Sequence, residues 1–411
     1  AETTPSLFIS DEKYEVARRR QVRCAFVSTN SITQGEQVGV LWSELHSQGI
    51  HIQFAHRTFQ WTNDAPGKAA VHCVIIGFGM DKPKAPVIYD YPDIKKEPIP
   101  IKVTEINPYL MDTNTVFLGR RSMPICAVPE MGNGGKPTDG GHLLLDDDER
   151  KELIKLEPAA KKWLRPFVMG DEFINGIPRW CLWLEGMTGE ELKRHPYIRA
   201  RVDRVQAMRT ASAKAATRQL AGTPMLFGEI RQPQSRYYLA IPKVSSENRR
   251  FIPIGFLDSK TICGDKIFFI DNATLFHFGV LTSTMHMAWM RRTCGRLKSD
   301  YSYSSSIVYN NFPWPMSGHA QCKEQAPETY ARIEVAAQEV LDARVEHGNT
   351  RLATLYDPAL MTPRLWKAHR TLDTAVERAY LACGGKRKYE GDNDRVAFLF
   401  ELYARYTSLL G

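Results

Sequence analysis

The sequence predicts a mixed fold in three parts: the last strands of an incomplete doubly wound α/β sheet, a mixed α+β region, and a small all-α region at the C-terminal end. Three observations lead to this prediction. A strand, a helix and two more strands follow one another over residues 24–78, strands alternate with helices over 146–292, and the pattern after about residue 325 is helical. Hydrophobic residues at 43% and charged residues at 24% are typical of a soluble globular protein.

The first part begins with a short apolar strand over residues 24–30. The next segment, Gln34–Gln48, is predicted to be a helix with one apolar face made of Val38, Leu41, Trp42 and Leu45. Two strands, Ile50–Trp61 and Ala69–Phe78, then form a hairpin around the polar loop 62–68. We expect the final strand to fold back antiparallel at the end of a doubly wound sheet, whose earlier strands are missing from the chain.

The remaining elements follow a connector over residues 81–112, which is rich in Pro and Lys. Asp146–Lys155 reads as a helix with Asp146 as N-cap and Glu149 completing a capping box. A single apolar helix is predicted over Ala273–Arg292, and the last helix over Asn393–Leu410. The predicted strands of this region are 179–184, 236–241, 251–257 and 266–270.

Positive charge is concentrated in one segment. The net charge is +8, and eight cationic residues between Lys193 and Arg218 face a single acid, Asp203. Ile198–Leu220 is predicted to be a helix, and cations on several of its faces would repel one another unless an anion lies alongside. We therefore expect DNA phosphate contacts from Arg199, Arg201, Arg204, Arg209, Lys214 and Arg218. A solvated charged helix is the alternative.

Composition excludes several classes of protein. No apolar run approaches the roughly 20 residues that a membrane span needs. The eight cysteines include no C-x-x-C pair, and no histidine has metal-ligand spacing, so neither a disulfide framework nor a metal site is predicted. A reducing cytoplasm is the expected compartment.

Five motifs occur in a familiar order: 27–38, 54–61, 179–184, 242–250 and 309–315. They read Val-Ser-Thr-Asn-Ser-Ile-Thr-Gln-Gly-Glu-Gln-Val, Phe-Ala-His-Arg-Thr-Phe-Gln-Trp, Arg-Trp-Cys-Leu-Trp-Leu, Pro-Lys-Val-Ser-Ser-Glu-Asn-Arg-Arg and Tyr-Asn-Asn-Phe-Pro-Trp-Pro. Together they resemble the C-terminal half of the MmeI-like enzymes, bacterial proteins that join a nuclease, an adenine-N6 methyltransferase and a DNA target-recognition domain. The resemblance spans essentially the whole chain.

The resemblance implies three domains and one missing half. Residues 1–110 would be the end of the methyltransferase domain with its connector, 111–320 the target-recognition domain, and 321–411 a helical C-terminal domain. The family's glycine-rich S-adenosylmethionine loop and Asn-Pro-Pro-aromatic motif should precede Ser28, and neither is present. We therefore expect no catalytic residue in this chain, an inactive isolated fragment, and a partner in the missing nuclease and methyltransferase half. S-adenosylmethionine is the cofactor implied for the complete enzyme.

We assign the pocket for the flipped base and the cofactor-binding residues to the N-terminal part, residues 1–110. Phe59 and Trp61 are candidates for stacking on an adenine flipped out of the duplex, while an ordinary hairpin core is the alternative. Thr29 and Asn30 follow a strand, where open α/β sheets bind ligands, so they are candidates for lining the cofactor or base pocket. Simple capping of the following helix is their alternative role.

Base readout is assigned to residues 294–304, which resemble the part of the family that discriminates a base pair. Lys298 and Asp300 are expected to alternate along an extended segment and face the same side. Lysine can donate to guanine and aspartate can accept from the paired cytosine, so this pair would read one G·C pair. An exposed ion pair is the alternative. Arg296 and Ser302 are further readout candidates, and Arg249 and Arg250 are either phosphate contacts or structural partners of Glu247.

The function predicted from the sequence is therefore sequence-specific recognition of double-stranded DNA, as the specificity half of an adenine-N6 methyltransferase that flips its target base. The alternative is a stand-alone, non-catalytic DNA-binding module or a degraded remnant.

Overall fold

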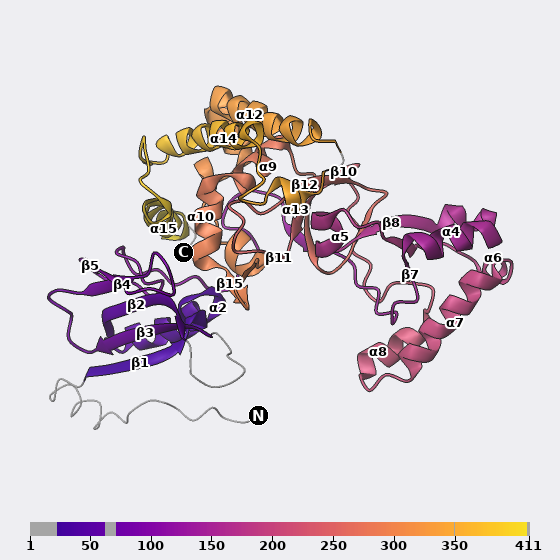
Figure 1. Cartoon of the computed structure of the whole chain (residues 1–411), viewed down its shortest axis with the longest axis horizontal. Helices are drawn as coiled ribbons and strands as arrows, with labels where there is room; N and C mark the ends of the chain where they lie inside the picture. Colours follow the sequence, from indigo (N-terminus) through magenta and orange to yellow (C-terminus); the bar gives the residue numbers. More distant parts are fainter. Residues whose placement is uncertain (1–22, 62–70, 349, 409–411) are drawn as a thin grey trace.

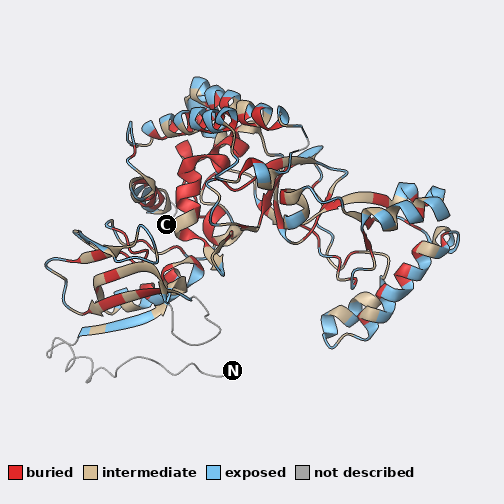
Figure 2. Cartoon of the chain, in the orientation of Figure 1, coloured by how far each residue is buried: buried red, intermediate tan, exposed pale blue. Residues whose placement is uncertain are grey.

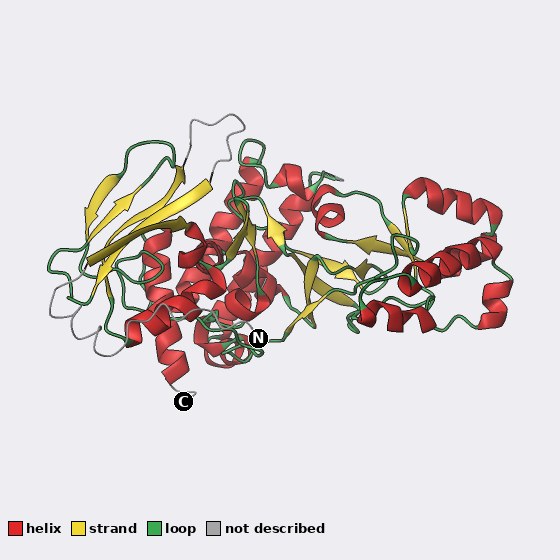
Figure 3. Ribbon diagram, turned by 90° about the horizontal axis from the view of Figure 1, so that it is seen from below, coloured by secondary structure: helices red, strands yellow, loops and turns green. Residues whose placement is uncertain are grey.

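The computed structural model describes residues 23–61, 71–348 and 350–408. These residues form an elongated molecule with a sheet at one end, a group of helices in the middle and a narrow arm at the other end (Figure 1). Seen from below, the same three regions follow one another along the long axis (Figure 3). The predicted hairpin loop 62–68 lies outside the described residues.

The N-terminal sheet has five strands in the order β1-β3-β2-β4-β5. Its strands are β1 (Arg23–Thr29), β2 (His51–Trp61), β3 (Val71–Gly79), β4 (Val87–Asp90) and β5 (Ile99–Lys102). β3 lies between β1 and β2 and is antiparallel to both, so β1 and β2 run parallel to each other. The predicted antiparallel strand is therefore found in β3, but it is not the last strand of the sheet, because β4 and β5 follow it.

β1 is an edge strand with apolar side chains on both faces. Phe26 and Val27 are each more than half exposed, and no further described strand pairs with the outer side of β1. Adjacent side chains of a strand point to opposite faces, so both faces of this edge are apolar. An exposed apolar edge is a surface that normally receives another strand or a cover.

The predicted helix of the first part packs against this sheet. It consists of α2 (Gly35–Gln37), a wider helical turn over Val38–Trp42, and α3 (Ser43–Ser47). Val38 and Trp42 are buried as predicted, whereas Leu41 is 39% exposed and Leu45 is only partly buried. The wider turn changes the angle between successive side chains, which rotates Leu41 out of the predicted apolar face.

The segment 81–112 is part of the fold and not a free connector. It contributes β4 and β5 to the sheet, and its end is buried around Tyr109. The Asn107 side-chain oxygen accepts hydrogen bonds from the backbone N–H groups of Tyr109 and Met111. The Tyr109 ring lies 5.1 Å from that of Phe400 in the last helix. The sheet is thereby joined to the C-terminal helices.

Three smaller sheets form the middle region. Their strands are β6 (Met131–Asn133), β7 (Leu144–Leu145), β8 (Leu164–Val168), β9 (Trp180–Leu182), β10 (Tyr237–Pro242), β11 (Val244–Ser245), β12 (Gly255–Asp258), β13 (Ile262–Cys263), β14 (Ile267–Asp271), β15 (Gly295–Leu297) and β16 (Asp300–Ser302). The orders are β12-β10-β14-β6, β11-β16-β15 and β13-β8-β9-β7. All four predicted strands are found, although β9 and β12 are shorter than predicted.

The arm contains the cationic segment. Its helices are α4 (Asp147–Leu156), α6 (Gly189–Lys193), α7 (Pro196–Thr210) and α8 (Ala215–Gln219), whereas α5 (Gly170–Asn175) lies beside β10 in the middle region. Asp146 caps α4 through a capping box with Glu149, as predicted. The single helix predicted over Ile198–Leu220 is wrong, because α7 ends at Thr210 and the chain turns before α8.

The C-terminal helices are packed on two helices of the middle region. They are α11 (His319–Gln325), α12 (Pro327–Val345), α13 (Leu352–Leu355), α14 (Pro363–Leu381) and α15 (Asp392–Ser408). They cover α9 (Leu275–Thr282) and α10 (Thr284–Thr293), which are almost entirely buried (Figure 2). One hydrophobic core extends from Val38 to Tyr403, and a second core fills the arm.

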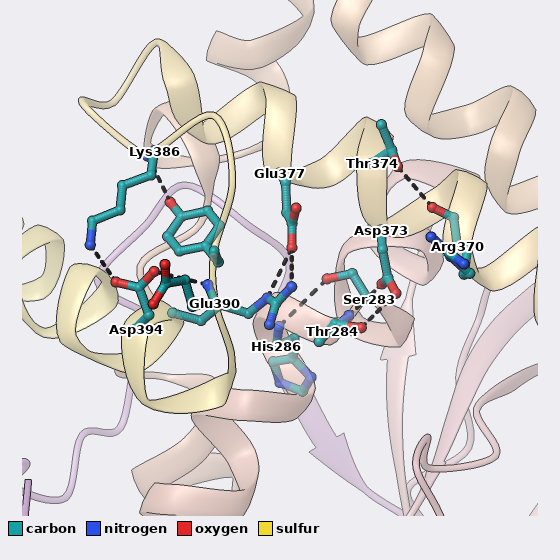
Figure 4. Close-up of polar contacts among 12 residues, drawn as sticks. Ser283, Thr284, His286, Arg370, Asp373, Thr374, Glu377, Lys386, Glu390 and Asp394 are labelled. Atoms are coloured by element: carbon teal, nitrogen blue, oxygen red, sulfur yellow. Dashed lines mark hydrogen bonds and ion pairs between the residues drawn. The ribbon is translucent and has the colours of Figure 1, made fainter.

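The apolar helix predicted over Ala273–Arg292 is divided into α9 and α10 at Ser283. Ser283 is extended and its hydroxyl caps α10. The Asp373 carboxylate of α14 accepts hydrogen bonds from Thr284 N and Oγ1, both at 2.6 Å (Figure 4). A carboxylate at this position stabilises the start of a helix. Arg395 of α15 also pairs with Glu377 of α14 at 2.6 Å.

Candidate nucleic-acid interface

A short hairpin of the middle region carries the residues predicted to read bases. β15 and β16 pair with Leu297 opposite Asp300, which leaves Lys298 and Ser299 as a two-residue turn. Lys298 has a φ of 57°, in the left-handed region that such turns use. The prediction that Lys298 and Asp300 alternate along one extended segment is therefore wrong. Both nevertheless lie at the tip of the hairpin, with Lys298 exposed and Asp300 partly buried.

Arg296 lies in β15, two residues before the turn, and its contacts stabilise the hairpin. Its guanidinium lies 4.1 Å from the centre of the opposite Tyr301 ring and donates to Ser299 O at 2.8 Å. It also pairs with Glu247 at 3.6 Å, and the backbone N–H of Glu247 donates to Asp300 Oδ1 at 3.4 Å. Arg296 Nε is buried and has no hydrogen-bond partner among the described residues. Arg296 is therefore held in place while part of its donor capacity stays unused.

Ser302 lies deeper in the same small sheet. It pairs with Gly295 on one side and with Val244 on the other, so its strand is the central one. Its side chain is partly buried. Ser302 shares a strand face with Asp300, two residues nearer the tip, and its predicted role in readout stays a prediction.

The aromatic residues at the end of β2 form a stacked cluster. The Phe59 and Tyr91 rings stack at 5.3 Å, and Trp61 lies 6.2 Å from Phe59 and is 47% exposed. His56 Nδ1 is 2.8 Å from the Tyr91 hydroxyl, and burial lowers the pKa of His56. The register of β2 shifts between His56 and Phe59, and such bulges redirect side chains. One face of Phe59 is thus occupied by Tyr91, whereas Trp61 remains open to solvent.

Thr29 and Asn30 lie at the carboxyl end of β1, beside the end of the parallel strand β2. Thr29 Oγ1 is 2.8 Å from Ser31 Oγ, and Asn30 Nδ2 donates to Thr58 Oγ1 at 3.4 Å. Neither side chain caps the helical residues that follow, so the alternative of simple helix capping is not observed. The roles of Thr29 and Asn30 stay predictions.

Two adjoining cavities open between the N-terminal sheet, the β15–β16 hairpin and the C-terminal helices. Their volumes are about 320 and 640 Å³, and they share Arg291, Tyr301 and Asp392. We call them together the arginine cleft. It is lined by six arginines, Arg57, Arg249, Arg250, Arg291, Arg292 and Arg296, and by three carboxylates, Asp90, Glu247 and Asp392. The cleft has an excess of positive charge beside the β15–β16 hairpin, and Tyr91 connects it to the aromatic cluster.

Arg249 and Arg250 line the larger cavity of this cleft. The Arg250 guanidinium is exposed and lies 4.7 Å from the centre of the Trp366 ring. Burial lowers the pKa of Arg249. The predicted alternative, a structural pair with Glu247, is wrong for the described residues because Glu247 pairs with Arg296. Their predicted phosphate contacts stay predictions.

Arg209 of α7 has a structural role that contradicts its predicted phosphate contact. Its side chain is fully buried. Nε donates to Thr138 O, Nη1 to Leu220 O and Thr223 O, and Nη2 to Pro137 O and Leu226 O, all at 2.8–3.0 Å. A guanidinium has five N–H donors, so none remains for a phosphate. The carbonyls come from residues 137–138 and from residues 220–226 beyond α8, so Arg209 joins the end of α7 to both segments.

Arg201 is the second correction on α7. It is buried and donates to His142 O and Leu144 O at 2.7 Å, and it pairs with Glu149 at 3.0 Å. It therefore fastens α7 to the start of α4. The remaining cations of this segment, Arg199, Arg204, Lys214 and Arg218, are exposed, and their phosphate contacts stay predictions.

Three arginines of the cleft were not predicted from the sequence. Arg57 lies in β2, and Arg291 and Arg292 lie in the last turn of α10. Two adjacent cations at the end of an otherwise apolar helix were a usable signal, although favourable interaction with the helix dipole explains such residues equally well. Arg57 and Arg292 come together at residues 109–110, because Arg57 donates to Leu110 O and Arg292 to Tyr109 O.

Among residues 23–61, 71–348 and 350–408, no group of His, Cys, Asp and Glu is arranged to hold a metal ion. In the same part of the chain, no helix is long and apolar enough to cross a membrane.

Three family models match successive segments of the chain. The DNA-methyltransferase domain of MmeI matches residues 6–90, its target recognition domain matches 112–316, and its C-terminal domain matches 325–411.

The chain is also similar to two named proteins. DNA methyltransferase A of Bacillus subtilis (strain 168) is 39% identical over 391 residues, which are 95% of this chain and 42% of that protein. A solved structure of the Type IIL restriction-modification enzyme MmeI in complex with DNA is 48% identical, with a TM-score of 0.87. That match covers 97% of this chain and 51% of the solved chain. The chain thus spans about half the length of the relatives it matches.

Proposed function

The chain belongs to the MmeI family of restriction-modification proteins, and on that premise we propose that it recognises a specific sequence in double-stranded DNA. In this proposal it acts as the specificity half of an adenine-N6 DNA methyltransferase. The isolated chain binds DNA but transfers no methyl group.

The observation that carries the proposal is the position of the β15–β16 hairpin. Its exposed tip presents a cation and a carboxylate, Lys298 and Asp300, next to a cleft with an excess of arginine. Lysine and aspartate offer a donor and an acceptor that match the edges of guanine and cytosine in the major groove. Arginines beside such a tip supply the sequence-independent attraction to the backbone.

The aromatic cluster supports base flipping next to this readout. Trp61 keeps an exposed face, and a base stacked on an aromatic ring gains about 1–3 kcal/mol. Phe59 would act mainly as a packing partner, since Tyr91 already covers one of its faces. Thr29 and Asn30 would border the pocket at the carboxyl ends of β1 and β2. S-adenosylmethionine, when bound, supplies the methyl group.

The exposed edge of β1 supports a larger complete enzyme. Phe26 and Val27 would be covered by further strands of the methyltransferase half, continuing the sheet from its apolar edge. This half is the proposed protein partner. A reducing bacterial cytoplasm is the proposed compartment, and the absence of disulfides among the eight cysteines is compatible with it.

The test is selection of bound duplexes from a randomised DNA pool, carried out at low and at moderate salt. We expect an enriched motif that survives the added salt and contains a fixed G·C pair. Binding that enriches nothing and collapses with salt would contradict sequence recognition by this chain, because non-specific binding is almost entirely electrostatic. A methylation assay with S-adenosylmethionine on the enriched duplex is expected to show no transfer.

A further inference from the structure

The arginines around the smaller cavity have unused hydrogen-bond donors. Arg57 donates to Leu110 O and Asp90, and Arg291 donates to Asp392 and to Arg250 O. Arg292 donates only to Tyr109 O and Asn393 Oδ1 among the described residues. Toward the part of the chain that the structure describes, each of these guanidinium groups therefore uses two of its five N–H donors, and the buried Nε of Arg296 has no partner there.

Arg292 lacks a carboxylate partner among the described residues. Its hydrogen bonds go to neutral oxygens, whereas Arg57 and Arg291 each pair with an aspartate at 2.8–2.9 Å. Burial, together with the nearby positive charges of Arg57 and Arg296, lowers the pKa of Arg292 to about 10. Arg292 remains charged at neutral pH. Cations held this close repel one another, and an anion bound between them would remove that repulsion.

We propose that the smaller cavity of the arginine cleft binds one backbone phosphate of the bound DNA. Arg292 holds this phosphate chiefly, together with Arg57 and Arg296, and we call the cavity the phosphate site. The inference rests on the proposed function, and it names the residues that anchor the duplex. A phosphodiester presents two unesterified oxygens, which the planar guanidinium fork binds in a bidentate manner.

The position of the cavity favours DNA over a free small anion. Arg296 and Tyr301 line the cavity and belong to the two strands of the readout hairpin. A duplex whose base edges meet the tip would therefore carry its backbone past the cavity. Thr58 and Tyr91, from the side of the aromatic cluster, also line this cavity. The phosphate would lie between the base that is read and the base that is flipped, fixing the register of the duplex.

The first experiment measures how the affinity of the whole chain for a mixed-sequence duplex depends on salt, by fluorescence anisotropy. For Arg292→Gln we expect a salt slope smaller by about 1, because one phosphate contact is lost. Arg292→Lys keeps the charge and should retain most of the slope. Arg332→Gln is the matched control, since Arg332 pairs on the surface of α12 with Glu328 and lies outside the cleft.

The second experiment identifies the phosphate on a duplex cloned from the enriched pool. Single methylphosphonates remove the charge of one phosphate at a time. We expect one position to weaken wild-type binding about tenfold, the effect of one charge-assisted hydrogen bond. The same substitution should change binding by Arg292→Gln less than twofold. Arg57→Gln, on a different element, should show the same loss, which separates the contact from damage to α10.

The outcomes distinguish a failure of the phosphate site from a failure of the proposed function. If the salt slopes of Arg292→Gln and Arg57→Gln equal that of wild type, the phosphate site is contradicted, even if the chain still selects a sequence. A reduced slope in a chain that selects no sequence would support the phosphate site and contradict the proposed function. If inorganic phosphate competes with DNA equally well for wild type and for Arg292→Gln, the phosphate site is also contradicted.

Discussion

Helix α7 and the arginine cleft are both rich in arginine, but they use it differently. On α7, Arg209 is fully buried and all five of its donors meet backbone carbonyls. In the cleft, Arg292 has two donors engaged among the described residues and lines an open cavity. The number of cations along a segment therefore does not predict where a phosphate binds. The number of unused donors that face a common cavity is the better guide.

The first prediction tests the structural side of this comparison and has the largest expected effect. Arg209→Ala removes five hydrogen bonds to backbone carbonyls and leaves a cavity at a fully buried position, so the free energy of unfolding should fall by about 3–5 kcal/mol. Urea unfolding followed by circular dichroism measures the change. Arg204→Ala, on an exposed position of the same helix, should stay within about 0.5 kcal/mol of wild type. Equal free energies of unfolding for the Arg209→Ala and Arg204→Ala variants would contradict the structural role of Arg209.

The second prediction concerns the larger cavity of the cleft. Arg250→Ala should weaken DNA binding about tenfold and equally for all sequences, because a phosphate contact carries no base information. Its stacking on Trp366 is worth only about 0.5–1 kcal/mol at an exposed site, so the fold should persist. Anisotropy with enriched and scrambled duplexes measures both affinities. A selective loss on the enriched duplex would instead make Arg250 a reader of bases.

The third prediction addresses the exposed cations of the arm and has the smallest effect. Arg199→Ala should weaken DNA binding only a few-fold at moderate salt, because charges in water are screened more strongly than charges in a cleft. The effect should grow as the salt concentration is lowered. A loss as large as that of Arg250→Ala would show that the arm contributes as much anchoring as the cleft.

Local sequence signals predicted much of the fold. The fold-back of β3, the capping box at Asp146 and the strands β10 and β14 follow from alternation, caps and turn residues that lie close together in the chain. The break at Ser283 was missed because an Asp373 carboxylate, distant in sequence, stabilises the start of α10. The end of α7 was missed for a similar reason, because Arg209 near its end is held by carbonyls of residues 220–226, beyond α8.

The site was predicted less completely than the fold. The hairpin residues were found, but their register was not, since Lys298 adopts a left-handed turn that no local residue such as glycine announces. Arg57, Arg291 and Arg292 were missed because β2 and α10 bring them to one cavity only through the tertiary fold, in which Arg57 and Arg292 bind the neighbouring carbonyls of Leu110 and Tyr109. Tertiary packing decides both features, and a single sequence does not reveal it.

The measurement that tests the central claim most directly is selection from a randomised DNA pool with the double variant Lys298→Glu and Asp300→Arg, beside wild type. The exchange reverses donor and acceptor at the hairpin tip, so we expect the preferred base to change at one position while the other positions keep theirs. Lys298→Ala is the companion variant and should relax that position alone. Uniform weakening at every position would contradict base readout by the hairpin and make these residues phosphate contacts.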